Sequence, residues 1–204
     1  MLFANSYKEI AYDSVGYYKE RGSRFVGYCY LVKTKKEIKK KIELVKKKEK
    51  SANHYCFAYV LNIDKSIFKI SDDGEPSSTA GKPILSQIKS NDLTNVLIIV
   101  VRYFGGTKLG IPGLIRSYKK TTINTINKTE IITKNIQEEY DLFFKHSCIN
   151  DVMKNIKRWN LSILESDFNL DCKIKVLVSK QKSDMVFDFF NKYEKVQIKY
   201  IKSI

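Results

Sequence analysis

The sequence contains no apolar run long enough to cross a membrane. Its longest one, "VLIIVV" at residues 96–101, is the length of a strand, whereas a membrane helix needs about 20 residues. The first ten residues, "MLFANSYKEI", show no basic region followed by an apolar segment and a cleavage site, so nothing predicts export. We therefore expect a cytoplasmic protein that does not associate with membranes.

Metal-binding and disulfide patterns are also missing. The four cysteines lie far apart, there is no C-x-x-C pair, and the chain has only two histidines. A zinc cluster or a disulfide framework would need closely spaced ligands or paired cysteines. We expect buried free thiols, no metal and no cofactor.

The sequence also lacks the standard phosphate-binding and calcium-binding motifs. In "SDDGEPSSTAGKPIL", residues 71–85, six residues separate Gly74 from Gly81 and Pro83 follows Lys82, whereas a Walker A loop has four intervening residues and then Ser or Thr. The twelve-residue ladder of an EF-hand is absent, and the glycines of residues 105–113 do not follow the dinucleotide spacing. Three common ligand classes thus have no supporting motif.

What the chain does have is an excess of positive charge in one part. Residues 1–133 carry 24 basic and 12 acidic side chains, whereas residues 134–204 carry 13 and 10. A net charge of +12 against +3 favours a polyanionic partner for the first part, such as a phosphate backbone. The alternative explanation for part of the lysine excess is codon bias, because the chain is also rich in Ile and Asn, as proteins of AT-rich genomes are.

Strand-forming and helix-forming patterns alternate through the first part. Two or three strands are expected before residue 34, a hairpin over residues 54–71, and a strand at 94–104 that is buried on both faces. Residues 34–50 have a helical period, with Thr34 as N-cap and Glu37 as its capping-box partner, and a lysine-rich outer face that is either solvated or tracks phosphates. Two further helices are expected to begin at Pro83 and Pro112, the second with Leu114, Ile115, Tyr118 and Ile126 on one face.

Residues 134–204 give a βαββαβ pattern. The expected strands are 135–145, 161–168, 172–179 and 196–204, and the expected helices are 147–160 and 182–195. This order is typical of a ferredoxin-like sandwich. We therefore predict an α+β protein with two domains, 1–133 and 134–204, without a linker rich in Pro, Gly or Ser.

Two loops are the candidate sites. Strand, glycines, lysine and helix start follow one another in "RYFGGTKLGIPGLIR", the general form of an anion-binding loop, and the start of the preceding helix offers further backbone amides. The candidate anion-binding residues are Lys82, Arg102, Gly105, Gly106, Lys108, Gly110 and Arg116. On this hypothesis the protein binds RNA, the ribosome or another anionic partner without catalysis.

The alternative hypothesis is a hydrolase of the peptidase type. It would use His54 with Asp72, Asp73 and Glu75, with or without a metal, and it requires these side chains to converge on one cleft. If arginines and backbone amides hold the carboxylates instead, this hypothesis loses its support. A structural turn, with Asp-Gly as turn chemistry and with carboxylates paired by Arg102, Lys108 or Arg116, is the simplest interpretation of the acidic loop.

Four segments together resemble the signature of the IMPACT/YigZ family. They are "SRF" at 23–25, "NHYCFAY" at 53–59, "SDDGEPSSTAGKPIL" at 71–85 and "VVRYFGGTKLGIPGLIRSY" at 100–118. The resemblance implies an N-terminal domain with the α/β sandwich fold of the second domain of ribosomal protein S-five. It also implies a ferredoxin-like second domain similar to modules of elongation factor G.

The resemblance further implies a role around translation, with a protein partner as an alternative to RNA. Eukaryotic members carry an additional N-terminal domain without a counterpart here, so their partner is not carried over. The sequence departs from the family pattern at Asn53, Ser78 and Pro112, where the family usually has Thr, Gly and Gly. The sequence gives no indication of the oligomeric state.

Overall fold

The computed structural model describes residues 5–169 and 171–204. These residues form two compact units, Tyr7–Lys134 and Asn135–Ile204, the second joined by residues 5–6. We call them unit 1 and unit 2 and describe each by itself. Both combine helices with antiparallel sheets, which confirms the predicted α+β class.

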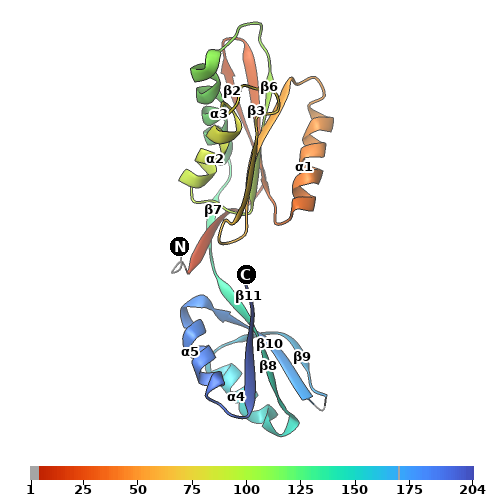
Figure 1. Ribbon diagram of the computed structural model, residues 1–204, viewed down its shortest axis with the longest axis vertical. Coiled ribbons are helices and arrows are strands. Elements are labelled where there is room, and N and C mark those ends of the chain that lie inside the picture. Colours follow the sequence, from red (N-terminus) through yellow and green to blue (C-terminus); the bar gives the residue numbers. More distant parts are fainter. Residues whose placement is uncertain (1–4, 170) are drawn as a thin grey trace. The chain divides into compact units, whose positions relative to one another are not determined.

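Unit 1 is built on a five-stranded antiparallel sheet in the order β2-β3-β6-β4-β5. Its strands are β2 (Ser14–Glu20), β3 (Ser23–Leu31), β4 (His54–Leu61), β5 (Ile67–Ser71) and β6 (Val96–Tyr103). Its helices are α1 (Lys35–Lys48), α2 (Gly81–Ser90) and α3 (Gly110–Ile126), and a separate two-stranded sheet pairs β1 (Ser6–Ile10) with β7 (Ile131–Asn135). Figure 1 shows α2 and α3 on one face of the large sheet and α1 on the other.

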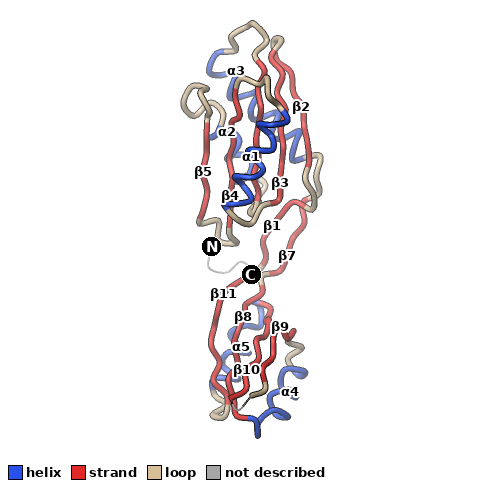
Figure 2. The backbone as a smooth tube through the Cα atoms, turned by 90° about the vertical axis from the view of Figure 1, so that its right-hand side faces the viewer, coloured by secondary structure: helices blue, strands red, loops and turns tan. Residues whose placement is uncertain are grey.

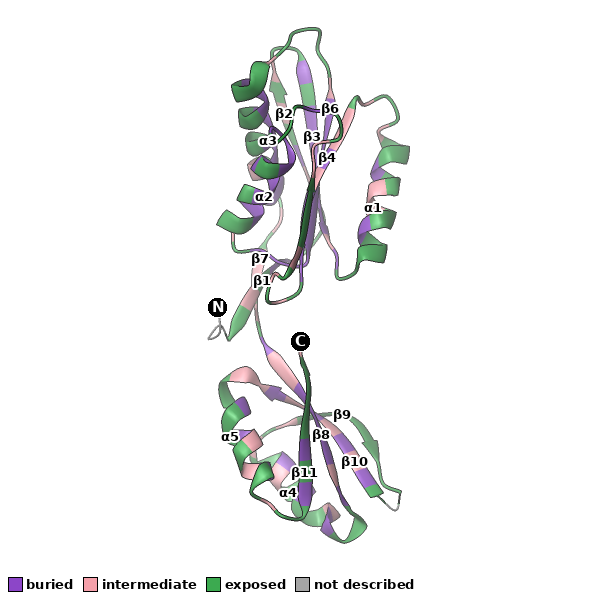
Figure 3. Ribbon diagram, in the orientation of Figure 1, coloured by how far each residue is buried: buried purple, intermediate pink, exposed green. Residues whose placement is uncertain are grey.

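Because helices cover both faces, the sheet contributes to two apolar cores. On the central strand β6, Ile98 and Val100 join the core under α2 and α3, while Leu97 and Ile99 join the core under α1. Every residue of β6 except Tyr103 is buried, and Figure 3 shows buried residues along the middle of the large sheet. The predicted strand with two buried faces is confirmed.

The capping of α1 follows from its sequence. Thr34 is the N-cap, and its hydroxyl accepts the Glu37 amide at 3.2 Å. The Glu37 carboxylate accepts the Lys33 amide at 2.8 Å and has a pKa below its usual range because of that bond. The predicted N-cap is therefore confirmed, with the reciprocal bond made one residue earlier than in the standard capping box.

The starts of α2 and α3 differ from the prediction. Both helices begin two residues before their prolines, at Gly81 and Gly110, because the first four amides of a helix need no partner within it and a proline is tolerated anywhere in that turn. On α3, Leu114, Tyr118 and Ile126 are buried as expected, but Ile115 is exposed.

Unit 2 is a four-stranded antiparallel sheet with two helices. Its order, β11-β8-β10-β9, places the first and third strands of the unit at the centre, as the tube in Figure 2 shows. The elements are β8 (Gln137–Lys145), the 3-10 helix η1 (His146–Cys148), α4 (Ile149–Arg158), β9 (Ser162–Asp167), β10 (Asp171–Ser179), α5 (Lys180–Asn191) and β11 (Val196–Ser203). The predicted βαββαβ order is confirmed.

Alternation along the two central strands of unit 2 explains its core. Leu142 and Phe144 on β8 and Ile174 and Val176 on β10 are buried with residues of α4 and α5. Their sequence neighbours point to the other face of the sheet. Within the described residues, no helix is long and apolar enough to span a membrane.

Candidate functional site

The acidic loop between β5 and α2 folds around the carboxylate of Asp72. Its Oδ1 accepts the amides of Ala80 and Gly81 at 2.9 and 2.8 Å, and its Oδ2 accepts the Ser78 amide at 3.0 Å. Asp72 therefore caps the start of α2, where backbone amides would otherwise attract an external anion. Lys82, proposed as part of an anion site here, is exposed, but the amides beside it are already occupied.

Asp73 fastens the same loop to the start of β4. Its Oδ2 accepts the Tyr55 amide at 2.7 Å, and its carbonyl oxygen lies 2.8 Å from Nδ1 of His54. Because a carbonyl oxygen can only accept, Nδ1 of His54 is the donor in this bond. Asp73 and Gly74 both have positive φ, 41° and 86°, so glycine at the second position suits the turn.

Glu75 lies at the centre of a buried polar network. Both its carboxylate oxygens accept from Nη1 of Arg102, at 2.8 and 3.0 Å, and Oε1 also accepts from the Tyr118 hydroxyl at 2.8 Å. Glu75 and Arg102 are only 8% and 6% exposed. Burial, with the nearby Cys56 and Glu75, raises the pKa of Tyr118, so the phenol stays protonated and donates.

Arg102 therefore differs from its predicted role. Its guanidinium is paired inside the protein and packs near the rings of Phe25 and Phe104, with centroid distances of 5.7 and 5.6 Å. The prediction that it meets an anionic partner at the surface is corrected, because its charge already neutralises a buried carboxylate.

Cys56 completes the network without being a reactive thiol. Its Sγ donates to the Asp72 carbonyl oxygen at 2.9 Å and lies 3.3 Å from the Tyr118 hydroxyl. Burial raises the pKa of Cys56, and a thiol must be deprotonated to act as a nucleophile. All four cysteines are free and buried, as expected.

These contacts bear directly on the hydrolase hypothesis. Each of the three carboxylates has a different set of partners: the start of α2, the start of β4, and Arg102. None of these carboxylates bonds to the His54 ring, whose Nδ1 donates to the Asp73 carbonyl oxygen instead, and no group of three or more His, Cys, Asp or Glu able to hold a metal occurs among the described residues. An arginine and backbone amides hold the carboxylates, which is the arrangement that removes support from the hydrolase hypothesis.

The glycine loop after β6 is held against the turn between β2 and β3. A Cβ at Gly105 would lie 1.9 Å from the carbonyl carbon of Gly22, so neither chain segment has room for a side chain at that point. The Gly105 amide donates to Ser23 Oγ at 3.3 Å, and the Phe104 amide donates to Asn53 Oδ1 at 2.8 Å. Two amides of the predicted anion loop are thus used internally.

The rest of this loop faces outward. Gly106 and Gly110 have φ of 84° and 67° and are exposed, and a Cβ at Gly106 would meet no atom within 4 Å. Lys108 is exposed, and Arg116 is half exposed while pairing with Glu20 at 3.1 Å. These four predicted residues lie together at one end of unit 1, around the start of α3.

Sequence reasoning missed three neighbours of these residues. Arg21 is exposed in the turn that touches Gly105, and Phe104 and Ile111 are exposed by 49% and 57%. We call Arg21, Phe104, Lys108, Ile111 and Arg116 the tip surface; the turn and the loop that carry it lie at the same end of unit 1 in Figure 1. The sequence could have indicated the exposure of Arg21, because it precedes Gly22 in a turn between two strands.

The three departures from the family pattern have local roles. Asn53 supplies the oxygen that accepts the Phe104 amide. Ser78 adopts a φ of 65°, a conformation that costs less for glycine. Pro112 lies in the first turn of α3, where its missing amide is not needed.

Comparison with known proteins agrees with the motifs. The family model described as "Impact N-terminal domain" matches residues 21–126. IMPACT family member YvyE of Bacillus subtilis is 30% identical over 162 residues, which are 79% of this chain and 75% of the relative. IMPACT family member YigZ of Escherichia coli is 29% identical over 143 residues, 69% of this chain and 70% of the relative.

A crystal structure of a hypothetical protein superposes on this chain with a TM-score of 0.74 and 25% sequence identity. The superposition covers 98% of this chain and 99% of the hypothetical protein. The chain belongs to the IMPACT family, as its four motifs indicated.

Proposed function

We propose that this protein is a translation-associated regulatory protein that binds RNA, on the ribosome or free, through unit 1. The translation-associated part rests on membership of the IMPACT family, whose resemblance implied such a role. The RNA-binding part rests on the charge of residues 1–133, 24 basic against 12 acidic side chains, and on the tip surface.

The tip surface is the observation that carries the proposal. It combines three exposed cations and an exposed aromatic ring with the start of a 17-residue helix that has no acidic residue in its first turn. Cations attract the phosphate backbone, while an exposed ring offers a stacking surface for a base. Arg102 is excluded from this role by its pairing with Glu75, and Lys108 and Arg116 become the central pair.

The test is charge reversal at that pair. A Lys108→Glu, Arg116→Glu variant is compared with Lys154→Glu, Lys157→Glu, which makes the same change in net charge at two exposed positions on α4 of unit 2. Binding of single-stranded RNA is measured by fluorescence anisotropy over a salt series, and ribosome association by co-sedimentation before and after nuclease treatment.

We expect the first variant to bind RNA more weakly and to lower the slope of log K against log salt by about 1.5, because two phosphate contacts are lost. The control should keep most of its affinity. Equal affinities of the two variants would refute the proposal, and ribosome association that survives nuclease treatment would indicate a protein partner instead.

A further inference from the structure

Among the residues that the structure describes, helices cover the sheet of unit 2 on one face only. α4 and α5 pack on the side of Leu142 and Ile174, and the alternate residues of β8 and β10 form the opposite face. In Figure 1 no helix of unit 2 lies on that side of the sheet. We call this the open face.

Lysines form the outer layer of the open face. On β8, Glu139 and Asp141 are 7% and 5% exposed, because lysines of the neighbouring strands fold over them. Lys173 pairs with Asp141 at 2.8 Å, and Lys202 pairs with Glu139 at 3.4 Å; these lysine side chains are 40% and 58% exposed. The carboxylates lie beneath and the ammonium groups lie outside, so each pair is neutral as a whole but directs its cation toward a partner.

Phe143 lies on β8, one of the two central strands, with these lysines on the neighbouring strands. It is directly opposite Lys173 on β10 and Gln197 on β11, and Lys173 Nζ is 5.5 Å from its ring centroid. The ring is only partly buried. It is therefore an apolar platform within a layer of cations.

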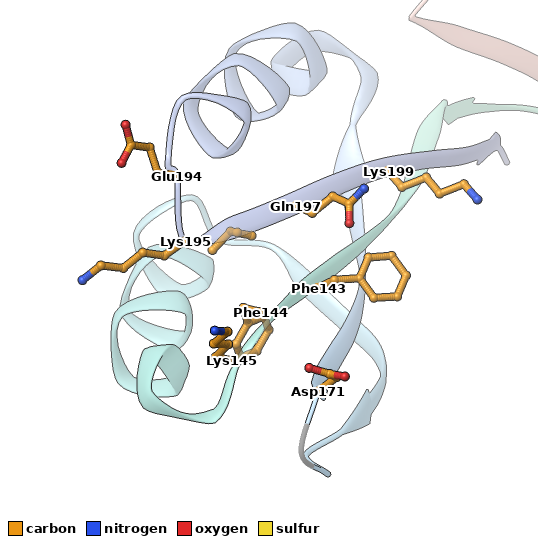
Figure 4. Close-up of a pocket in the computed structure, with 9 residues that line it drawn as sticks. Phe143, Phe144, Lys145, Asp171, Glu194, Lys195, Gln197 and Lys199 are labelled. Carbon is orange, nitrogen blue, oxygen red and sulfur yellow. The ribbon is translucent and has the colours of Figure 1, made fainter.

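A groove of about 640 Å³ passes beside this ring. Its lining is Phe143, Phe144, Lys145, Asp171, Glu194, Lys195, Val196, Gln197 and Lys199. Figure 4 shows Phe143 and Lys199 projecting to one side, with Glu194 and Lys195 directed the opposite way. The volume is in the range of ligand-binding clefts, and three lysines and two carboxylates are among the lining residues.

An unpaired acceptor lies on the strand that carries Phe143, outside the residues that line the groove. Oδ1 of Asp141, two residues before Phe143 on the same face, is buried without a hydrogen-bond partner among the described residues. A buried acceptor left in this state is unfavourable. A donor group held against the ring of Phe143 and reaching past Lys173 would satisfy it, and the exocyclic amino group of a nucleobase is such a donor.

We propose that the open face binds single-stranded nucleic acid, with one base stacked on Phe143 and the backbone running along Lys199 and Lys145. Four-stranded sheets of this topology can stack bases on aromatic residues of their central strands, and a stacked base with lysines beside it is the common arrangement for single strands. The inference extends the proposed function by a second contact, yet it depends on none of the residues of the tip surface.

The experiment compares a base-containing oligonucleotide with a backbone alone. The full chain is titrated into a labelled single-stranded RNA and into an abasic phosphodiester of the same length. The variant is Phe143→Leu, which keeps apolar volume but removes the ring. The matched control is Phe68→Leu, because Phe68 on β5 is also exposed and has a lysine over its ring, Lys89 Nζ at 5.0 Å.

We expect wild type and Phe68→Leu to prefer the base-containing strand. Phe143→Leu should bind that strand about tenfold more weakly and should lose the preference, with little change for the abasic backbone. Unchanged fluorescence of Trp159, the single tryptophan and part of unit 2, verifies that the variant is folded.

Equal binding of RNA by Phe143→Leu and wild type overturns the base site, and so does equal affinity of wild type for the two strands. If Lys108→Glu, Arg116→Glu weakens RNA binding while Phe143→Leu does not, this inference fails alone. If Phe143→Leu loses affinity while Lys108→Glu, Arg116→Glu does not, the proposed function fails and this inference stands.

Discussion

Arg102 and Glu75 form the buried ion pair on which the acidic loop of unit 1 depends. Removing one partner of a buried pair leaves the other charge uncompensated, which costs about 3 kcal/mol or more. We expect Glu75→Gln to lower the free energy of unfolding of unit 1 by roughly this amount. Urea unfolding followed by circular dichroism measures it.

The matched control for that substitution is Glu165→Gln, which removes a carboxylate paired with a lysine at the surface; the Glu165 side chain is 71% exposed. Exposed pairs contribute little, so this variant should unfold almost as the wild type does. A Glu75→Gln protein as stable as the control would contradict the structural role of the pair.

Glu49 gives a pH-dependent prediction. Burial raises the pKa of this carboxyl, but hydrogen bonds from the hydroxyls of Tyr103 and Tyr28 outweigh burial and lower it below its ordinary value of 4.5. A pKa lowered by folding stabilises the protein above the unfolded pKa, and this contribution is lost as the pH falls through the folded one.

We therefore expect wild type to lose stability below about pH 4.5, relative to neutral pH, more steeply than Glu49→Gln. Urea midpoints at pH 7 and pH 4 measure the difference. Parallel loss in the two proteins would contradict this assignment.

The roles of single residues were predicted from the sequence only where they depend on nearby residues. Thr34 caps α1 because the motif lies within one turn. Arg102 and Glu75 are 27 residues apart, and nothing local shows that they pair across strand and loop. Their burial follows from tertiary packing, so the sequence left open whether Arg102 pairs with the acidic loop or meets a partner at the surface.

At the scale of elements, α2 depends on a capping residue that does not lie within its first turn. Asp72, eight residues before Ala80, accepts the first two amides of the helix start. We expect Asp72→Ala to expose these amides and to lower stability by about 1 to 2 kcal/mol, the range for loss of a cap. Hydrogen exchange at Ala80 and Gly81 should become faster.

Asp73→Ala is the comparison for that variant, since it removes only the bond to the Tyr55 amide. Its effect on exchange at the start of α2 should be small. Slow exchange at Ala80 and Gly81 in Asp72→Ala would show that another group caps the helix.

Elements were predicted well where their period was clear, and less well at their ends. The order of unit 2 follows from alternation and helical spacing, which depend on burial alone. The starts of α2 and α3 were predicted at Pro83 and Pro112, yet both helices begin two residues earlier. In α2 the carboxylate of Asp72 accepts the amides that precede the proline, and in α3 the glycine loop leads into the helix at Gly110.

At the scale of the whole molecule, each unit has its own apolar core. Trp159 packs on Phe189, with ring centroids 5.7 Å apart, inside unit 2. Tryptophan fluorescence therefore monitors unit 2, whereas circular dichroism monitors both units. A substitution in one core should leave unfolding of the other nearly unchanged if the domains predicted from the sequence unfold independently.

We expect Glu75→Gln to shift the transition seen by circular dichroism and to leave the fluorescence transition in place. A substitution in unit 2, Val176→Ala, should shift the fluorescence transition and only the part of the circular dichroism change that comes from unit 2, with a loss of about 1 to 3 kcal/mol for the buried methyl groups. Equal shifts in both signals would show that the units unfold as one.

The carboxylate of Asp72 has a consequence for how the family signature is understood. An acidic residue followed by glycines and a helix start invites a search for a ligand, but here the chain supplies that ligand itself. Selection for folding alone would then preserve the stretch in any relative that uses the same cap. Conservation of such a stretch would then reflect the stability of the loop. Residues that bind a partner have to be sought among the exposed side chains that lack internal partners.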